Sequence, residues 1–419
     1  MAGPTVLLIN KFYHDIGPAG GVGRYLLQEE EDLTAAGWNV IPFAMNDEHA
    51  RPSPWSRFFV QARDYSRPRM TRRVVSDSLS LIWNREAARN LERLLQEVKP
   101  QVAHLHNIYH HLSPSILPVL ARHRVPMVLT LHDLRLLCPA IHMRRQGKPC
   151  ERCRGGRFWQ AVAGSCVKGS RLASALAAVE TANQHQRGLY PRLVTRFLCP
   201  SHFYLEKFAQ WGYPRHKLTH LPNFVDSETW RPVTEKPEPA YCYFGRISAE
   251  KGLATLLQAQ QLWEQQAGDD TPAPTLLVAG SGPWDEELQR QATGLGLRRI
   301  EILGRLTTDQ LRGVLARAAF TVIPSEWYEN APMAALESMA AGRPVVGTRI
   351  GGIPELISDG EDGILCEPGD PTDLLAALRR ALTLGPEAGR RARQKVELQA
   401  TRPQHMQRLG EILSETAAP

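Results

Sequence analysis

The chain contains 419 residues, more than one hydrophobic core usually supports, and its composition of 43% hydrophobic and 22% charged residues is ordinary for globular proteins. No run reaches the roughly eighteen apolar residues of a membrane-spanning helix, and the opening segment does not resemble a secretory signal, so we expect a cytoplasmic protein. The net charge of +7 is accompanied by no known nucleic-acid-binding motif, which argues against nucleic acid as a partner.

Short apolar runs alternate with helical patterns along the first half of the chain. The sequence predicts a helix beginning near Gly23 and strands at Thr5–Ile9, Asn39–Phe43, Val102–Leu105, Met127–Leu131 and Thr195–Leu198. Such alternation is typical of a parallel sheet covered by helices. A stretch rich in proline and charge follows at Leu221–Pro239, and within it we place an interdomain linker over residues 226–239.

The same alternation resumes after the linker. Helices are predicted near Lys251–Gln266 and Trp284–Thr293, and strands at Tyr241–Phe244, Thr275–Ala279, Ile300–Leu303, Phe320–Ile323 and Pro344–Val346. We therefore expect two doubly wound α/β domains, over residues 1–225 and 240–395. A terminal helical region over residues 396–419 is expected to pack back toward the first domain.

Two glycine-containing loops follow predicted first strands. Gly20-Gly21-Val22-Gly23 precedes a helix expected to begin near Arg24, and such glycines suit a diphosphate cradle, although a structural turn explains them equally well. In the second domain, Arg246 and Lys251 follow the strand Tyr241–Phe244. Cations at the carboxyl end of a parallel strand suit a diphosphate, and ion pairs with surface acids are the alternative.

The segment around Pro324–Pro332 leads into an alanine- and methionine-rich helix. Pro332 is expected as its first residue and Gly342 as its stop, which places Glu329 on the entering loop and Glu337 inside the helix. A carboxylate buried in such a helix needs a partner, and a ribose diol would be one, although periodicity alone also allows an exposed glutamate.

This segment resembles the E-x7-E motif of retaining GT-B glycosyltransferases, with Glu329 and Glu337 as its glutamates. Further matching motifs appear in order at Gly20–Gly23, Leu131–Asp133, Pro222–Asp226, Gly245–Gly252, Ala279–Pro283, Leu303–Gly304 and Gly351–Glu355. Together they are similar to glycosyltransferase family four. The resemblance implies two Rossmann-like domains facing across a cleft, and a retaining hexosyltransferase that moves sugar from a UDP- or GDP-linked donor to a glycan or polyprenyl-linked acceptor in polysaccharide or glycolipid biosynthesis.

The resemblance also implies a role for each matching residue. Arg246 and Lys251 would hold the donor diphosphate, Glu337 the ribose, Glu329 the sugar hydroxyls, and His132 would face the donor sugar. Further donor contacts would come from Gly20, Gly21, Gly23, Gly280, Gly282, Leu303, Asn330 and Ala331. No catalytic metal is expected. A nucleoside-diphosphate-sugar 2-epimerase and a non-catalytic sugar-nucleotide-binding protein are the alternatives on this architecture.

Four of the seven cysteines gather in one insertion, residues 138–166. They are Cys138, Cys150, Cys153 and Cys166, and the middle pair has C-x2-C spacing. Four thiols suffice for a tetrahedral site, so the sequence predicts a structural zinc ion, with an iron-sulfur cluster or free thiols as alternatives. His104 and His106 share one face of a strand, which suggests either a second metal site or residues of the acceptor cleft.

The basic charge is concentrated in residues 51–73, where seven arginines accompany a single acid, Asp64. The arginines are Arg51, Arg57, Arg63, Arg67, Arg69, Arg72 and Arg73. With Phe58, Phe59 and Val60 beside them, they suggest peripheral contact with anionic lipid at the inner face of the plasma membrane. A solvated basic helix or loop explains the pattern equally well.

Overall fold

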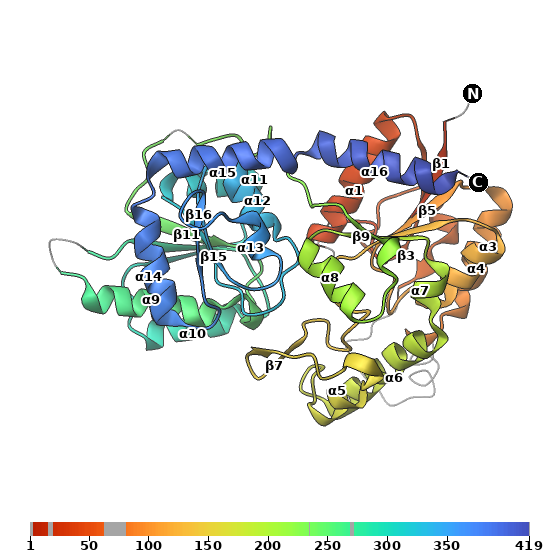
Figure 1. Ribbon diagram of the computed structural model, residues 1–419, viewed down its shortest axis with the longest axis horizontal. Helices are drawn as coiled ribbons and strands as arrows, with labels where there is room; N and C mark the ends of the chain where they lie inside the picture. Colours follow the sequence, from red (N-terminus) through yellow and green to blue (C-terminus); the bar gives the residue numbers. More distant parts are fainter. Residues whose placement is uncertain (1–2, 16–19, 63–80, 234, 269–271, 419) are drawn as a thin grey trace.

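The computed structural model describes residues 3–15, 20–62, 81–233, 235–268 and 272–418, which form two α/β lobes (Figure 1). Each lobe contains a six-stranded parallel sheet, ordered β10-β9-β6-β5-β1-β2 in the N-terminal lobe and β13-β12-β11-β14-β15-β16 in the C-terminal lobe. In each sheet the first strand is internal and later strands are added on both sides, as in Rossmann-like folds. The structure thus confirms two doubly wound α/β domains.

The N-terminal sheet consists of short buried strands, apolar on both faces because helices cover both sides. Its strands are β1 Thr5–Ile9, β2 Asn39–Phe43, β5 Val102–Leu105, β6 Met127–Thr130, β9 Arg196–Cys199 and β10 Leu218–His220. The predicted strands agree with these to within one residue at each end. The edge strand β10 was not predicted, because three residues are too few to show a period.

The helices of this lobe include one whose start differs from the prediction. They are α1 Gly20–Ala35, α3 Arg85–Glu97, α4 Leu117–Arg122, α5 Trp159–Ala163, α6 Arg171–Arg187, α7 Leu189–Leu193 and α8 His202–Gln210. Helix α1 begins at Gly20 rather than near Arg24, so the three glycines form its first turn. Glycine is a poor helix former, which hid this start, but buried Tyr25, Leu26 and Leu33 hold the helix against the sheet.

The C-terminal lobe repeats the pattern with its own core. Its strands are β11 Ala240–Phe244, β12 Thr275–Ala279, β13 Ile300–Gly304, β14 Thr321–Ile323, β15 Val345–Thr348 and β16 Gly363–Cys366. Its helices are α9 Leu253–Gln266, α10 Asp285–Gly294, α11 Thr308–Arg317, α12 Met333–Ala340, α13 Ile353–Leu356, α14 Pro371–Leu382 and α15 Gly385–Gln399.

Three predicted helix starts in this lobe shift by one or two residues, and one of them is that of α10, which begins at Asp285 instead of Trp284. Helix α9 begins at Leu253 instead of Lys251, because Gly252 is left-handed with φ of 72° and ends a short 3-10 turn. Pro332 is the N-cap of α12 rather than its first residue. Gly342, with φ of 74°, follows the end of α12, as predicted.

The last helix, α16 Arg402–Ala417, returns to the N-terminal lobe. In Figure 1, α15 and α16 run one after the other along the same side of both lobes. The apolar residues Leu409, Ile412 and Leu413 pack in one cluster with Val6 of β1, Val102 of β5 and other buried residues. Arg402 forms an ion pair with Asp32 of α1 at 2.7 Å, so the chain end joins the two lobes.

The described part of the basic segment contradicts the expected apolar contact with lipid. Phe58, Phe59 and Val60 are buried, because Val60 lies in β4 Val60–Gln61, which pairs with β3 Met45–Asn46 beside α3. Arg57 forms an ion pair with Glu97 of α3. The remaining arginines from Arg63 onward lie outside the described residues. Within the described ranges, no helix is long and apolar enough to cross a membrane.

Candidate functional site

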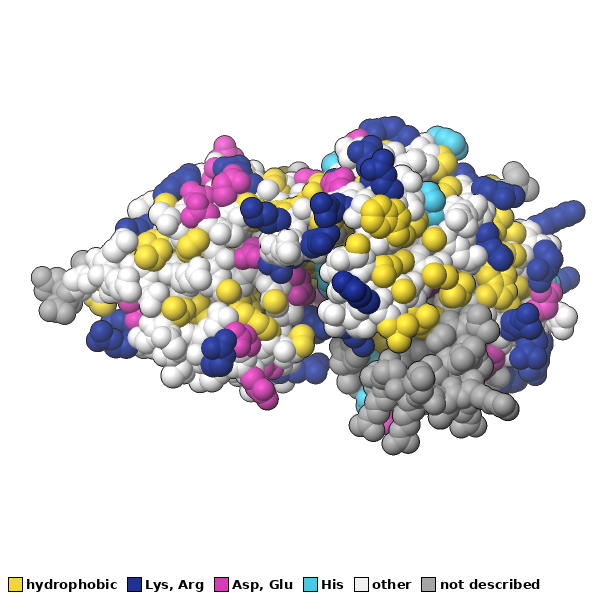
Figure 2. All heavy atoms as spheres, turned by 90° about the horizontal axis from the view of Figure 1, so that it is seen from below, with side chains coloured by type: hydrophobic (Ala, Val, Ile, Leu, Met, Phe, Trp, Pro, Cys, Tyr) yellow, Lys and Arg dark blue, Asp and Glu magenta, His cyan; other side chains and the backbone are white. Residues whose placement is uncertain are grey.

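The predicted site residues follow strands at the carboxyl ends of the two sheets, where ligands bind in open α/β folds. The lobes are joined there by hydrogen bonds: the side chain of Asn330 donates to the carbonyl oxygen of Leu131 at 2.9 Å, and Asn223 donates to that of Ala331 at 2.9 Å. On the face shown in Figure 2, basic side chains lie where the two lobes meet. The site is therefore composed of residues from both lobes.

Lys251 and Glu329 are brought together by the loops after β11 and β14. Lys251 Nζ lies 2.6 Å from Glu329 Oε1, and the Ser325 hydroxyl donates to the same oxygen at 2.6 Å. Gly252 permits this approach, because a Cβ there would lie 1.7 Å from the carbonyl oxygen of Pro324. Lys251 thus pairs with a buried site carboxylate rather than with a surface acid.

Arg246 is placed differently from Lys251. Its side chain is exposed and makes no hydrogen bond or ion pair with any part of the chain that the structure describes. The next loop lies against the Arg246 loop backbone to backbone, because a Cβ on Gly280 would meet the oxygen of Gly245 at 1.8 Å, and one on Gly282 that of Ile247 at 2.0 Å. These glycines therefore allow the two loops to pack closely beside the guanidinium of Arg246.

Glu337 lies in α12 beneath the N-terminus of α1, and its side chain is largely but not fully buried. Burial raises the pKa of its carboxyl to about 7, and nearby Arg24 acts in the opposite direction. Arg24 Nη1 lies 3.8 Å from Glu337 Oε1, across the gap between the lobes. Gly20 and Gly21 stand in the same turn with open space where a Cβ would be. Sequence reasoning missed Arg24, which lies directly after the glycines.

Three further predicted contacts lie on this side of the C-terminal lobe. Leu303 in β13 is partly exposed and packs on the lobe's core, near the loop that contains Gly280. Asn330 accepts a hydrogen bond from the Ser201 hydroxyl at 3.0 Å. Ala331 is buried at the approach to α12 and lines, with Asn223, a cavity of about 410 Å³ on the flank of the interlobe contact.

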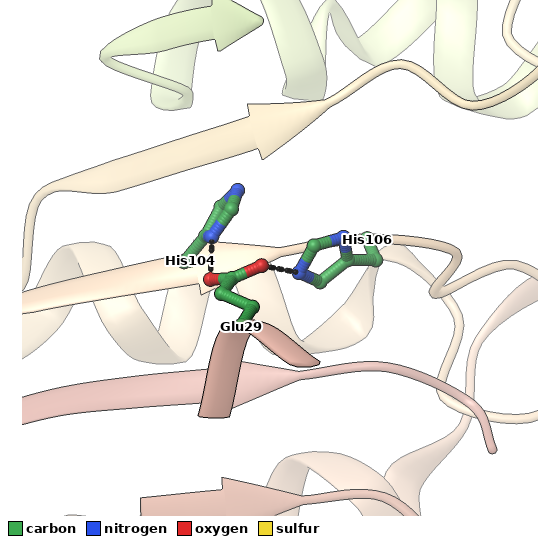
Figure 3. Close-up of side chains that lie close together, drawn as sticks. All are labelled: Glu29, His104 and His106. Atoms are coloured by element: carbon green, nitrogen blue, oxygen red, sulfur yellow. Dashed lines mark hydrogen bonds and ion pairs between the residues drawn. The ribbon is translucent and has the colours of Figure 1, made fainter. Parts of the chain in front are cut away.

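His132 follows β6 and is half-buried against α1, with its ring centroid 5.3 Å from that of Tyr25. Burial and then His106 hold the pKa of His132 well below its ordinary value, which keeps the imidazole neutral. Its Nε2 lies 2.8 Å from Nδ1 of His106. Behind His106 lie Glu29 and His104, shown in Figure 3, which no sequence signal linked to the site beyond the shared face of the two histidines.

The four predicted cysteine ligands line one small cavity of about 20 Å³. Burial, together with the three neighbouring thiols, raises the pKa of Cys153 to about 12. Among the described residues, only Glu29, His104 and His106 bring three ligand atoms within 4.8 Å of one another. No three of the four sulfurs therefore lie within 4.8 Å of one another, and they would have to move closer to reach the roughly 3.8 Å between two sulfur ligands of one zinc ion.

The insertion that contains these cysteines also reaches the C-terminal lobe. Its hairpin, β7 Arg144–Arg145 and β8 Lys148–Pro149, places Arg144 in an ion pair with Glu326. The ring of His142 lies 5.0 Å from Trp327, and Tyr328 donates a hydrogen bond to Glu151 at 3.2 Å. The insertion therefore contacts the loop that leads to Glu329.

Comparison with known proteins agrees with this architecture. Residues 19–229, half of the chain, match the model of Glycosyltransferase Family 4, and residues 238–383 match that of Glycosyl transferases group 1. A glycogen synthase of Mycobacterium tuberculosis is 35% identical over 181 residues, which is 42% of each protein. A sulfoquinovosyl transferase of Arabidopsis thaliana is 32% identical over 173 residues, 38% of this chain and 32% of that protein. The aligned segments thus span less than half of these relatives.

Solved structures match over nearly the whole chain. Sucrose-phosphate synthase from Thermosynechococcus elongatus aligns with a TM-score of 0.70 at 19% identity, covering 98% of each chain. Anabaena HepE, solved with UDP and glucose, aligns with a TM-score of 0.66 at 16% identity, covering 98% of this chain and 100% of that one. At such identities the likeness concerns the fold. The chain therefore belongs to glycosyltransferase family 4 and has the GT-B fold with two Rossmann-like domains.

Proposed function

We propose that this glycosyltransferase is a retaining hexosyltransferase that uses a UDP- or GDP-linked sugar and transfers it to a glycan or polyprenyl-linked acceptor. The observation that carries the proposal is that the loop and helix holding the Lys251–Glu329 and Arg24–Glu337 pairs contact the N-terminal lobe directly before His132, where Asn330 donates to the carbonyl oxygen of Leu131. HepE was solved with UDP, with UDP and glucose, and with UDP-glucose, which supports a uridine donor among the two.

Each group suits one part of such a donor. The free guanidinium of Arg246 and the ammonium of Lys251 would take the diphosphate and stabilise the charge that develops on the leaving group. Glu337, buried beneath the glycine-rich turn of α1, would accept hydrogen bonds from the ribose hydroxyls. Glu329 would release Lys251 to the phosphates and accept hydrogen bonds from the sugar.

Retention needs no second free carboxylate on the opposite face of the sugar. Glu329 is engaged by Lys251 and Ser325, and Glu326 by Arg144 and Thr255. We propose front-face attack, in which the acceptor oxygen bonds to the anomeric carbon while the carbon–oxygen bond to phosphate breaks. The bond electrons go to the β-phosphate, which also takes the acceptor's proton, and the neutral His132 accepts a hydrogen bond from a sugar hydroxyl.

The cysteine pocket suits a structural metal ion, and the chemistry above requires none. Four thiols from one insertion surround a single cavity, and a bound zinc ion would hold them as thiolates. The ion would stabilise the insertion against the loop of Glu326 and Tyr328, since both contacts come from residues beside the cysteines.

The acceptor is proposed from the chemistry of the N-terminal lobe. Phe58 and Val60 are buried, so the described part of the basic segment can contact a lipid-linked substrate only through charged side chains. Arg51, which is exposed, is one of them. We therefore base the proposed role in polysaccharide or glycolipid biosynthesis, at the inner face of the plasma membrane, on the positive charge of the arginines in residues 51–73.

The test is a calorimetric panel of UDP, GDP, ADP and their sugar conjugates, followed by transfer assays with the donor that binds. Proton NMR of the product then gives the anomeric configuration, and we expect that of the donor. An inverted product would refute retention, and a free 2-epimer formed without acceptor would identify an epimerase. Selective binding with no turnover, equal in wild type and in Lys251→Ala, would instead indicate a non-catalytic nucleotide-binding protein.

A further inference from the structure

A chain of buried polar side chains leads from the interior of the N-terminal lobe to His132. Glu29 projects from α1, His104 lies in β5 and His106 follows that strand (Figure 3). Glu29 and His104 are 0% exposed and His106 is 2% exposed. A buried carboxylate is costly unless it is paired, and Glu29 is paired with two histidines.

The contacts arrange the cluster in one line. Glu29 Oε1 is hydrogen-bonded to Nδ1 of His104, whose Nε2 lies 2.8 Å from the Thr130 hydroxyl. Glu29 Oε2 lies within ion-pair distance of Nε2 of His106, at 3.2 Å, and neither atom makes a hydrogen bond to any described residue. Nδ1 of His106 then lies 2.8 Å from Nε2 of His132. Contacts of catalytic groups are often this loose before substrate binds.

A proton explains this geometry better than a metal ion. Glu29 and His104 touch in a direct hydrogen bond, closer than the roughly 3.3 Å between two ligands of one zinc ion. Burial by itself raises the pKa of Glu29, but His104 and His106 outweigh it, so the pKa lies well below its ordinary value. Burial and His104 lower the pKa of His106. The cluster is thus a carboxylate that faces the neutral imidazole of His106.

The nitrogen that carries the proton in each ring follows from that charge. A carboxylate only accepts, so His106 has to carry its proton on Nε2 toward Glu29. A neutral His106 then has a bare Nδ1, so Nε2 of His132 has to be the donor between the two rings. His132 is left with a bare Nδ1, which makes no hydrogen bond within the described part of the chain, on a half-buried side chain.

We propose that Glu29 and His106 are positioning residues that fix the tautomer of His132, so that its Nδ1 presents a lone pair to the donor sugar. The lone pair would accept a hydrogen bond from a sugar hydroxyl, and this step rests on the proposed function. Tyr25 packs against these histidines, and its ring centroid lies 5.6 Å from that of His106. The other titratable group that faces His132 is His405 of α16, whose Nε2 is taken by the Tyr25 hydroxyl at 2.7 Å.

The test is nitrogen-15 NMR of histidine-labelled full-length protein at about pH 7.5, which reports the tautomer of each ring, with His132→Gln assigning the His132 signals. We expect His132 protonated on Nε2 in the wild type. Glu29→Gln keeps an oxygen for His104 and turns an amide N–H toward His106. Both ring protons should then move, and His132 should carry its proton on Nδ1.

Thr130→Val is the matched control, because it removes a partner of His104 with little change in volume and leaves the contacts of Glu29 with His106 and of His106 with His132 in place. Its His132 tautomer should match the wild type. A wild-type His132 protonated on Nδ1, or a tautomer that survives Glu29→Gln, would overturn the proposal. So would a divalent ion that the wild type binds and Glu29→Gln loses.

Kinetics separate this inference from the proposed function. With the donor identified, Glu29→Gln should lower kcat at least about tenfold with little change in KM, while Thr130→Val follows the wild type. Equal losses of kcat in both variants, in proportion to melting temperature, would show a structural role only. A tautomer change in a protein without turnover would refute the proposed function. It would still support the inference that Glu29 and His106 fix the tautomer of His132.

Discussion

The buried carboxyl of Glu337 allows a prediction with a defined sign and size. Its side chain is 13% exposed, and burial raises its pKa from 4.5 to about 7. Each pH unit of such a difference corresponds to about 1.4 kcal/mol. Because the folded chain holds the proton more tightly than the unfolded one, the free energy of unfolding falls as pH rises from about 4.5 to about 7 and is level above that.

Glu337→Gln removes this dependence. Between pH 5 and pH 8 the wild type should lose about 2.5 kcal/mol of unfolding free energy relative to the variant, as worked from the two pKa values. Urea denaturation of both proteins at the two pH values measures the difference. Glu387→Gln, in the exposed first turn of α15, serves as control and should follow the wild type. Parallel pH curves for wild type and Glu337→Gln would refute the reasoning.

The same carboxyl should control donor affinity in the opposite direction. Binding of the ribose favours the ionised form, so the affinity for a nucleotide sugar should be about tenfold weaker at pH 6 than at pH 8. A sugar conjugate is the right ligand, since its diphosphate has no group titrating near neutrality, unlike a free terminal phosphate. Calorimetry in two buffers of different ionisation enthalpy should show proton release at pH 6. A pH-independent affinity would place the ribose elsewhere.

Three further predictions concern the contacts around the site. Lys251→Ala should lower turnover about 100-fold or more and lower the melting temperature, since it leaves Glu329 buried without its cation; near-normal turnover would contradict the assignment. Cys153→Ser should lower both the metal content of the purified protein and its melting temperature. Cys199→Ser, in β9 away from the pocket, should retain the metal. Equal metal content in the two variants would favour free thiols. Arg144→Ala should weaken donor binding about tenfold by calorimetry, because it removes the ion pair that holds the loop of Glu326. Arg390→Ala, which breaks an exposed ion pair in α15, should leave the affinity unchanged. Unchanged affinity in Arg144→Ala would show that the insertion does not support the donor site.

The sequence by itself determined the alternation of strands and helices, the two-domain architecture and the family. Buried parallel strands such as β1 and β12 are continuous apolar runs, and their pattern is local, so it can be read without the fold. The motif residues Arg246, Lys251 and Glu329 were found in the same way, because the glycines and prolines around them mark the loops after strands.

Only the tertiary structure decided which of these residues meet. The pairing of Lys251 with Glu329 and the position of Arg24 above Glu337 join residues far apart in sequence. The burial of Phe58 likewise depends on the neighbouring helix, which no local pattern contains. Glu29 is one of several acidic residues in the sequence of α1, and its place behind His106 follows from how α1 packs on β5. Charge and burial of such groups depend on the assembled sheet, and a one-dimensional pattern does not contain that information.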